Sequence, residues 1–570
     1  MNLWFLSEPK RLAIEREAIE RMQSKSTWLE GVEWILDSGI VLKAQIKAHE
    51  YIYEVKLSYP NLFPQTPPTV KPIDDDSRWS DHQYTDGALC LEWGPDNWHP
   101  SITGAQVLES AYRLIHAENP LGNKQEKEHI PSRHFLTEGQ KLRRKNIRFY
   151  VKSKFLDVIS TFHYNKVANM KFAMVFENKT LVMHVTALEK EDETLWTSSI
   201  LPEELKPSKE DIGLILKTQL PLEKIQTLKT ITDIEELYDK SSVKPLSDEK
   251  LILVIDKDNK PHALFSFKSD NELLEIPIVT ENNVKNRNPA YLSELNKRKI
   301  GIVGLGSLGS KVATSLARMG AEKFYLVDDD IFLSENIVRH TLDWKSVGAH
   351  KVDAVENQLK RISSYIYVKT SKINVTGQEA TTSLNAVLSQ LGNCDLIIDA
   401  TASPKVFNFL SAVSVSYKKP MVWGEIFAGG IGGLIARSRP DIDPDPQTMR
   451  HAFYETTKQF PDIDFNTFEP YGIEEETGKV MIASDADVNV IASHLTRLAV
   501  DTVLENDPSM FPFSMYLIGL TTSWIFEAPF DTRPIKTEHL QKYSKKQKVS
   551  EEELRPTIEF IQTLLEKTND

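Results

Sequence analysis

The chain has 570 residues and a net charge of −13, with 26% charged and 41% hydrophobic residues. This length is sufficient for more than one domain, and the acidic balance argues against nucleic acid as a partner, because phosphate binding needs clustered Lys and Arg. Two cysteines exclude a disulfide framework, Met1–Lys10 lacks a secretory signal, and no apolar run approaches the roughly 18 residues that cross a bilayer. We therefore expect a soluble protein of the reducing cytoplasm that has no membrane partner.

Residues 1–150 predict an α+β module. Helical spacing of apolar residues predicts helices at 9–24 and 102–117. A proline-dense stretch at 59–72 is predicted to be extended, because proline lacks the amide hydrogen that helices and sheet interiors use. Alternating or apolar segments predict antiparallel strands at 32–36, 40–46 and 51–57.

The middle of the chain carries no chemical motif. The charge-rich stretch 123–145 predicts an exposed helix or linker, with a domain boundary near 145–153. Short apolar segments then alternate with charged helical stretches, so we interpret residues 151–285 as a mixed linker or adaptor domain. In residues 286–570, strands, glycine turns and helices alternate, which predicts a parallel sheet with helices on both faces.

A glycine-rich turn joins the first predicted strand of this last region, 299–303, to a predicted helix. Its glycines are Gly304, Gly306 and Gly309. They allow the backbone to approach a ligand closely, and the following helix start attracts anions, so the turn predicts a phosphate site. Dinucleotide dehydrogenases carry the same motif, so the turn alone does not choose the enzyme class.

Charged residues beyond the next strands narrow the choice. The predicted strand 323–327 runs into Asp328, and the predicted strand 395–398 runs into Asp399. An adenylating enzyme needs cations to neutralise the α-phosphate as pyrophosphate leaves, whereas hydride transfer has no general need for them. An acid after the second strand can accept from ribose hydroxyls, and one after the later strand can bind magnesium. The residues are Asp328, Asp330, Asn336, Arg339, Lys351 and Asp399.

Together with the glycine turn, this ordered set resembles the adenylation domain of ubiquitin-activating (E1) enzymes and their bacterial ThiF and MoeB relatives. The resemblance implies a Rossmann-like domain that binds ATP and Mg²⁺. It places Asp328 on the ribose and Asp399 on the metal, with Asn336, Arg339 and Lys351 around the phosphates. It further implies a homodimer in which an Arg of the partner subunit reaches the phosphates, and the candidate for that role is Arg287.

Cys90 lies in a second pattern, which has paired prolines before it, Gly87 three residues upstream, and Trp98 and Pro100 downstream. The order resembles ubiquitin-conjugating (E2, UBC-like) enzymes, which carry an acyl group as a thioester, and it implies that Cys90 is the acceptor. The usual His-Pro-Asn motif is absent. The nearest equivalent, at 82–84, begins with His82, whose role is left open between catalysis and structure.

Most ubiquitin-activating enzymes use a cysteine of their own, yet this half contains only Cys394, whose place on a strand favours burial. Two explanations are open. The module adenylates only, and Cys90 attacks the adenylate directly, or a catalytic thiol has been replaced in this sequence. For the second explanation the candidate position is Ala483, just before a helix predicted at 490–504, and Ser493 is the next candidate.

The order of the modules resembles bacterial E2–E1 fusion proteins of CBASS antiphage operons. This resemblance implies that the carboxy terminus of a cGAS/DncV-like nucleotidyltransferase is activated and then ligated to a target amine, in antiviral defence. The conjugation target is left open. Two alternatives are a MoeB/ThiF-type sulfur-carrier adenylase, in which Cys90 has no role, and a non-catalytic adaptor that binds a ubiquitin-like protein.

Overall fold

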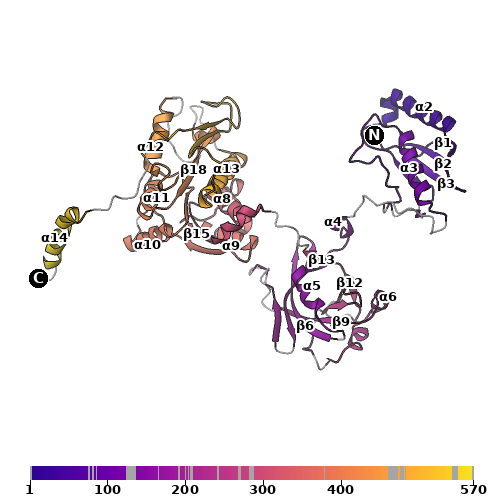
Figure 1. Ribbon diagram of the computed structural model, residues 1–570, viewed down its shortest axis with the longest axis horizontal. Helices are drawn as coiled ribbons and strands as arrows, with labels where there is room; N and C mark the ends of the chain where they lie inside the picture. The colour runs from indigo at the N-terminus through magenta and orange to yellow at the C-terminus, as the bar shows by residue number, and fades with distance from the viewer. Residues whose placement is uncertain are drawn as a thin grey trace. The chain divides into compact units, whose positions relative to one another are not determined.

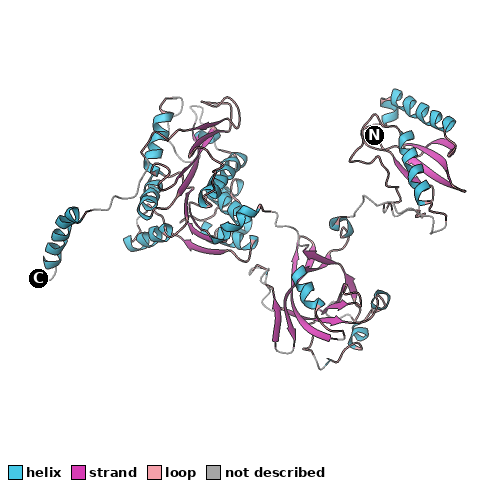
Figure 2. Ribbon diagram, in the orientation of Figure 1, coloured by secondary structure: helices cyan, strands magenta, loops and turns pink. Residues whose placement is uncertain are grey.

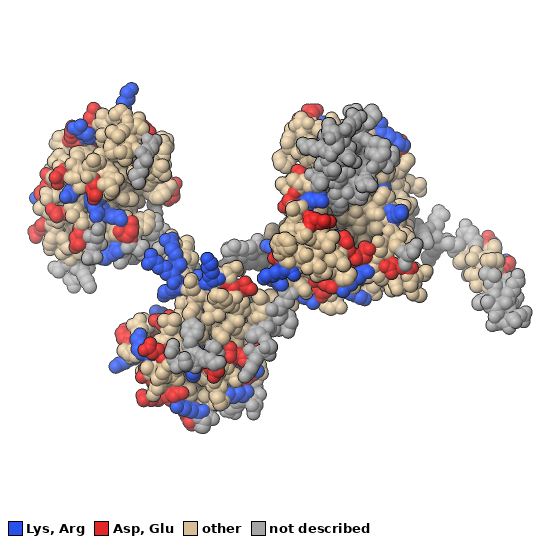
Figure 3. Space-filling view, turned by 180° about the vertical axis from the view of Figure 1, so that it is seen from behind, with Lys and Arg blue, Asp and Glu red and all other residues tan. Residues whose placement is uncertain are grey.

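The chain divides into two compact units, Met1–Arg144 and Lys145–Asp570. Charges of both signs are interspersed over the visible faces (Figure 3). None of the helices in the described parts of the chain is long and apolar enough to cross a membrane. The computed structural model describes residues 3–74, 77–79, 82–84, 86–122, 137–164, 166–190, 193–198, 201–202, 205, 210–240, 243–248, 250–266, 271–281, 288–377, 379–459, 473–474, 480–481, 483–541 and 550–567.

The first unit is a four-stranded antiparallel sheet packed against helices (Figures 1 and 2). Side chains alternate along a strand, so Tyr53, Val55 and Leu57 of β3 face one core and are fully buried. The predicted helices and strands are confirmed, and the proline-dense stretch supplies the edge strand β4. The elements are α1 Trp4–Ser7, α2 Pro9–Lys25, β1 Leu29–Leu36, β2 Ile40–Ala48, β3 Tyr51–Ser58, β4 Thr69–Pro72, α3 Gly104–Glu118 and α4 Glu138–Lys141.

The second unit starts with a nine-stranded sheet of order β12-β11-β10-β9-β6-β7-β5-β13, with β8 on β7. Strand β5 belongs to this sheet, since it pairs with β7 and β13, and the predicted boundary at residue 150 falls inside it. The predicted apolar segments form strands. The prediction of charged helices between them is mostly wrong, because the described helices of this region are short. The elements are β5 Ile147–Lys152, α5 Ser153–Ser160, β6 Lys166–Glu177, β7 Thr180–Lys190, β8 Glu193–Thr197, β9 Asp211–Lys217, α6 Leu222–Ile225, α7 Ile231–Glu235, β10 Lys250–Ile255, β11 Pro261–Ser266, β12 Leu274–Ile276 and β13 Ile278–Glu281.

The C-terminal sheet has the order β16-β15-β14-β17-β18-β19-β22-β23. Strands β14 to β18 run parallel, as predicted, and β19, β22 and β23 continue the sheet antiparallel. The strands are β14 Lys299–Val303, β15 Lys323–Val327, β16 Tyr367–Ser371, β17 Leu396–Asp399, β18 Met421–Phe427, β19 Gly432–Ser438, β22 Met515–Gly519 and β23 Thr532–Pro534.

Helices cover both faces of this sheet (Figure 1). One core contains residues of α8 Ser307–Arg318, α9 Lys351–Ile362 and α13 Asp485–Val503. The other contains residues of α10 Thr381–Gly392, α11 Pro404–Tyr417 and α12 Pro446–Thr457. The strand order reverses at β14, which lies between β15 and β17, so the sheet is Rossmann-like and has a switch point at the end of β14. The remaining elements are η4 Ala290–Lys297, η5 Ser334–Val338, η6 Trp344–Ser346, η7 Ala428–Gly430, β20 Ile473–Glu474, β21 Val480–Met481 and α14 Glu551–Lys567.

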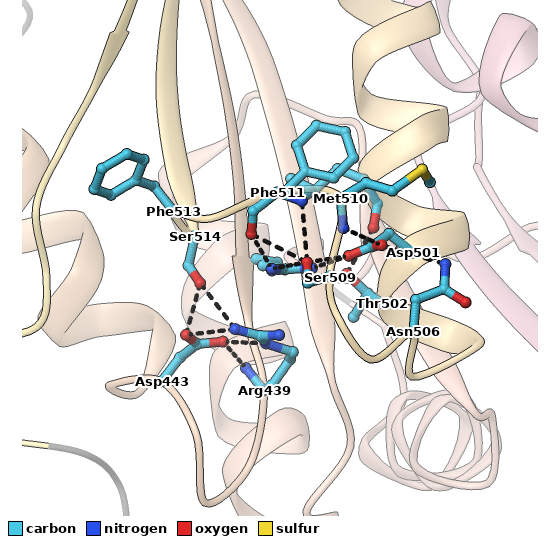
Figure 4. A network of polar contacts seen from close by, with 12 residues as sticks. Arg439, Asp443, Asp501, Thr502, Asn506, Ser509, Met510, Phe511, Phe513 and Ser514 are labelled. Carbon is cyan, nitrogen blue, oxygen red and sulfur yellow. Dashed lines mark hydrogen bonds and ion pairs between the residues drawn. The ribbon is translucent and has the colours of Figure 1, made fainter.

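A buried ion pair joins the end of α13 to the sheet, and Figure 4 shows the acid of this pair, Asp501, with the loop residues around it. Arg437 of β19 and Asp501 of α13 are each at most 1% exposed at the side chain, and their Nη1 and Oδ2 atoms are 2.6 Å apart. Asp501 also accepts hydrogen bonds from Ser509 Oγ, Asn506 Nδ2 and the Met510 amide. The pair therefore holds the 506–511 loop as well as the helix.

Asp501→Ala is expected to destabilise this region by about 3–5 kcal/mol, because it leaves the Arg437 guanidinium buried without a counter-charge. Hydrogen exchange of peptides from β19 and α13 would measure the loss locally, which suits a chain of several domains. Glu294→Ala is the matched control, since it breaks the exposed Lys297 pair and should cost about 0–1 kcal/mol. Equal exchange in the two variants would contradict this prediction.

Candidate active site

A pocket of about 390 Å³ lies at the carboxyl ends of β14, β15 and β17, where the strand order reverses. Its volume is in the range of small-molecule and cofactor sites, and its position is where open α/β sheets bind ligands. The pocket is lined by Gly304, Gly306, Ser307, Asp328, Asp329, Asp330, Asn336, Arg339, His340, Lys351, Ala400 and Thr401.

The glycine turn requires two of its glycines for different reasons. Gly304 has a φ of +86°, a conformation that side chains disfavour. A Cβ on Gly309 would lie 1.8 Å from the Gly304 carbonyl oxygen, so only glycine allows the helix to pack this close to the strand end. Gly309 does not line the pocket itself. Gly306 precedes α8 directly, which leaves the first amides of the helix facing the pocket side of the turn.

Asp328 is coupled to the turn. Its Oδ2 accepts from the Leu305 amide at 2.6 Å, and its Oδ1 accepts from the Asp330 amide at 2.9 Å. Burial raises the pKa of Asp328, although both amides act in the opposite direction. Each carboxylate oxygen keeps a further lone pair, so the expected contact with a ribose hydroxyl is compatible with this geometry and stays a prediction.

The polar residues predicted around the phosphates meet in this pocket. Lys351, the first residue of α9, is 9% exposed at its side chain and forms an ion pair with Asp330. Burial acts to raise the pKa of Asp330, but its hydrogen bond and ion pair with Lys351 lower it overall. Asn336 accepts from the Leu333 amide at 2.9 Å in the short helix η5, and Arg339 follows the same helix. Two separate segments thus bring an amide and two cations to the glycine turn.

His340 also lines the pocket and was not predicted from the sequence. Its Nδ1 accepts from the Leu342 amide at 3.1 Å, so its Nε2 carries the proton and donates to the Leu305 carbonyl oxygen at 2.7 Å. Burial lowers the pKa of His340 to about 4, which keeps the ring neutral at physiological pH. A lone histidine beside Arg339 gave no sequence signal for this role.

His340→Gln is expected to change how stability depends on pH. The ordinary pKa of 6.5 falls to about 4 in the folded protein, so below pH 6.5 the unfolded chain binds a proton that the folded chain does not. The stability from a neutral His340 is present above pH 6.5 and is lost as the pH falls. The unfolding free energies of wild type and variant should therefore converge by about 2 kcal/mol between pH 7 and 5 in urea denaturation. A constant difference would contradict this expectation.

Asp399 lies at the end of β17 and is 3% exposed. Its Oδ1 accepts from the Thr401 amide at 3.0 Å and hydroxyl at 2.7 Å, and burial raises its pKa to about 6. Asp399 does not line the 390 Å³ pocket. It lines an adjoining cavity, and Ala400 and Thr401, the next two residues, line the pocket itself.

Asp399 nevertheless fits the predicted role of a magnesium ligand. Among the described residues, none donates a hydrogen bond to its Oδ2. Magnesium is commonly held by one or two carboxylates together with substrate phosphates and water, so a single acid beside the pocket is sufficient. No cluster of three or more His, Cys, Asp or Glu residues occurs within the described ranges, which excludes an all-protein metal cage there.

Cys90 lies in the first unit, on a short hairpin closed by a bridge between Gln83 and Leu89. The Cys90 amide donates to the His82 carbonyl oxygen at 2.7 Å, and the Cys90 side chain is partly exposed. His82 is 5% exposed, and its Nε2 lies 3.7 Å from a Glu118 oxygen. The predicted acceptor is thus accessible, whereas His82 is paired with an acid of α3.

The remaining candidates are placed as follows. Ala483 is 3% exposed and packs in the core under α13. This burial counts against Ala483 as the position of a replaced nucleophile, because a thiol there would be shielded from its substrate. Ser493 is exposed on α13. Burial raises the pKa of Cys394 to about 11, which leaves almost no thiolate at neutral pH. Arg287 lies outside the described residues.

Comparisons with known protein families match two regions of this chain. Residues 280–509 match the model of the ThiF family. The C-terminal domain is ThiF-like. Residues 168–277, which contain most of the nine-stranded central sheet, match the model of a domain observed between E2 and E1 domains.

Two curated relatives are similar to part of this chain. The ATP-dependent ubiquitin transferase-like protein Cap2 of Escherichia coli is 27% identical over 247 residues, which cover 40% of this chain and 38% of Cap2. The adenylyltransferase and sulfurtransferase MOCS3 of Aedes aegypti is 31% identical over 132 residues, covering 23% of this chain and 29% of that protein. The matches thus span well under half of these relatives.

Solved structures of E. coli MccB are also similar. The structure of MccB with ATP has a TM-score of 0.33 and 15% identity, covering 45% of this chain and 69% of MccB.

Proposed function

We propose that the ThiF-like domain uses ATP to adenylate the carboxy terminus of a polypeptide, and that Cys90 then carries the acyl group as a thioester. The observation that carries the proposal is the meeting of Asn336, Arg339 and Lys351 with the glycine turn in one pocket at the switch point. The ThiF match over 280–509 supports it.

The pocket suits phosphoryl chemistry rather than hydride transfer. In adenylation a carboxylate oxygen attacks the α-phosphorus, the bond to the bridging oxygen of the β-phosphate breaks, and pyrophosphate leaves. Negative charge grows on the phosphate oxygens, and in this proposal Arg339 and Lys351, which line the pocket, neutralise it. The neutral His340 holds the turn and adds no charge of its own.

Asp399 would hold Mg²⁺ in this proposal. The bound ion would supply charge neutralisation at the phosphate oxygens. The residues of this chain orient the nucleotide: the turn and the start of α8 bind phosphate oxygens, and Asp328 accepts from the ribose.

The order of the domains supports the proposed thioester step. A thiolate attacks the acyl carbon of the adenylate and displaces AMP, and an amine later attacks the thioester and releases the Cys90 thiol. A central domain of the kind observed between E2 and E1 domains supports an E2-like, UBC-like role for the unit that precedes it. The first unit supplies the partly exposed Cys90 for that role.

For the substrate we propose a cGAS/DncV-like nucleotidyltransferase of a CBASS antiviral operon, joined through its carboxy terminus to a target amine in the cytoplasm. The Cap2 relatives, which are named ATP-dependent ubiquitin transferase-like proteins, support ATP-dependent transfer of a ubiquitin-like kind. We propose a homodimer through the ThiF-like domain, with an Arg from the partner subunit at the phosphates. Two apolar residues support a partner surface on this domain: Val338, which precedes Arg339 in the chain, is 70% exposed, and Trp344 of η6 is 72% exposed.

The test is exchange of labelled pyrophosphate into ATP, with Mg²⁺ and the full-length nucleotidyltransferase. Exchange should require the nucleotidyltransferase and disappear when its last residue is removed. Exchange without a carboxy-terminal substrate, or no ATP binding at all, would refute the proposal.

A sulfur-carrier adenylase is the second candidate, favoured by the similarity to MOCS3. It predicts the same exchange with a sulfur-carrier protein and no covalent adduct on Cys90. A non-catalytic adaptor predicts no exchange with either substrate.

A further inference from the structure

A strongly basic segment runs from α4 through β5 to the start of α5. Residues 139–156 contain seven Lys and Arg and no Asp or Glu. The whole chain has a net charge of −13, so the rest of it carries −20 once these seven cations are set aside. At physiological salt, exposed charges more than about 8 Å apart are largely screened, so a ligand at this segment responds to the charges near it more than to the net charge. The acidic total therefore does not exclude an anionic partner here.

Five cations of this segment pair with no acid among the residues that the structure describes. Arg148 is half-buried, and its Nε donates to the Lys145 carbonyl oxygen at 3.0 Å, which leaves the two Nη groups for a ligand. The other four are exposed. Exposed lysines elsewhere are paired with acids, such as Lys297 with Glu294. The five unpaired cations are Arg143, Arg144, Lys145, Arg148 and Lys154.

The large apolar side chains of the same segment are turned inward. Phe149 and Val151 of β5 and Phe155 of α5 belong to the core of the central sheet. Leu142 is 8% exposed, and Ile147, Tyr150 and Leu156 are half-buried. Protein interfaces and membrane-bound segments depend largely on exposed apolar or aromatic anchors, which this segment does not present. Surfaces that bind phosphate backbones are instead polar and strongly positive.

We propose that the basic segment 141–154 binds the phosphate backbone of double-stranded nucleic acid without reading its sequence. The unpaired cations neutralise phosphates and release the counterions condensed around them, so binding weakens steeply with salt. The guanidinium groups of Arg143, Arg144 and Arg148 offer planar forks that match phosphate oxygens. A duplex is favoured over a single strand because single-strand sites stack bases on aromatic rings, and no aromatic side chain of this segment is fully exposed. This inference is independent of the proposed adenylation.

The experiment measures fluorescence anisotropy of a labelled DNA duplex of about 20 base pairs, titrated with the full-length chain. Wild type should bind with a Kd of about 10⁻⁴–10⁻⁶ M at physiological salt, equally for two unrelated sequences, with a log–log salt slope of about −4.5 for five phosphate contacts. The triple variant Arg143→Ala, Arg144→Ala, Lys145→Ala should weaken binding about tenfold or more and flatten the slope to about −2. Its far-UV circular dichroism should match wild type, because the three side chains are exposed.

The matched control removes the same charge from three lysines that are already paired with acids, by Lys297→Ala, Lys360→Ala and Lys458→Ala. It should leave the Kd within about twofold of wild type and the salt slope unchanged. Equal weakening in the two triple variants would reveal an effect of net charge alone and would overturn the inference. So would absence of duplex binding by wild type, tighter binding of single-stranded DNA of the same length, or tighter binding of polyglutamate or phosphatidylserine vesicles, which would assign the segment to an acidic polypeptide or a membrane.

Discussion

Arg339→Ala is expected to lower the turnover of ATP–pyrophosphate exchange by about 10²–10³-fold, the loss typical of removing one preorganised charge-stabilising group. Arg339 lines the same pocket as the glycine turn, and in the proposed reaction its charge matters most when the α-phosphate becomes more negative. The effect should therefore fall on kcat more than on the KM for ATP, because ground-state binding keeps the turn, the α8 amides and Lys351.

Lys351→Ala should give a loss of the same order, and it also leaves the Asp330 carboxylate unpaired beside the phosphates. Lys360→Ala is the matched control: it removes an exposed Lys from the same helix, α9, where it pairs with Glu356, and should leave kcat unchanged. If Arg339→Ala retained wild-type exchange, the pocket would not be the site of adenylation. If it changed only the KM, Arg339 would bind the nucleotide without acting on the transition state.

Cys90→Ala is expected to abolish the covalent conjugate while pyrophosphate exchange stays within about twofold of wild type, since adenylation precedes thioester formation. The thioester is seen by non-reducing electrophoresis, before and after hydroxylamine. Cys90→Ser should give a hydroxylamine-resistant ester or no adduct.

Cys394→Ala is the control for this experiment, because burial holds the pKa of that thiol at about 11 and keeps it protonated. The thioester should persist in this variant. A thioester or a conjugate that persists in Cys90→Ala would show that Cys90 is not the acceptor and would contradict the proposal.

The meeting of the predicted residues in one pocket at the switch point could be predicted from the sequence because its parts are local signals. A strand, a glycine turn and a helix are consecutive at 299–318, and the acids and cations follow identifiable strand ends. Parallel strands bring the ends of β14 and β15 to one edge of the sheet. Lys351, the first residue of α9, lines the same pocket as Asp328 there, although no motif fixes the 23 positions between them.

The rest could not be predicted for equally physical reasons. Asp399 shares its small cavity with Glu425 of β18 and Arg450 of α12 only because α12 packs against the sheet beside β18. Neither Glu425 nor Arg450 belongs to a local motif. His340 acts through a backbone carbonyl 35 positions away. In the central domain, the charged stretches between the apolar segments predicted helices, but the described helices there are short and pairing between long strands such as β6 and β7 dominates.

The peptide unit of Leu305 is held from both sides, its amide by Asp328 at 2.6 Å and its carbonyl oxygen by His340 at 2.7 Å. The glycine turn is thereby preorganised, and a nucleotide that binds there as proposed has little backbone entropy left to remove. The proposed affinity for phosphates then depends on two side chains whose effect is to immobilise a backbone, and substituting either one should slow productive capture even where every group that faces the ligand is intact.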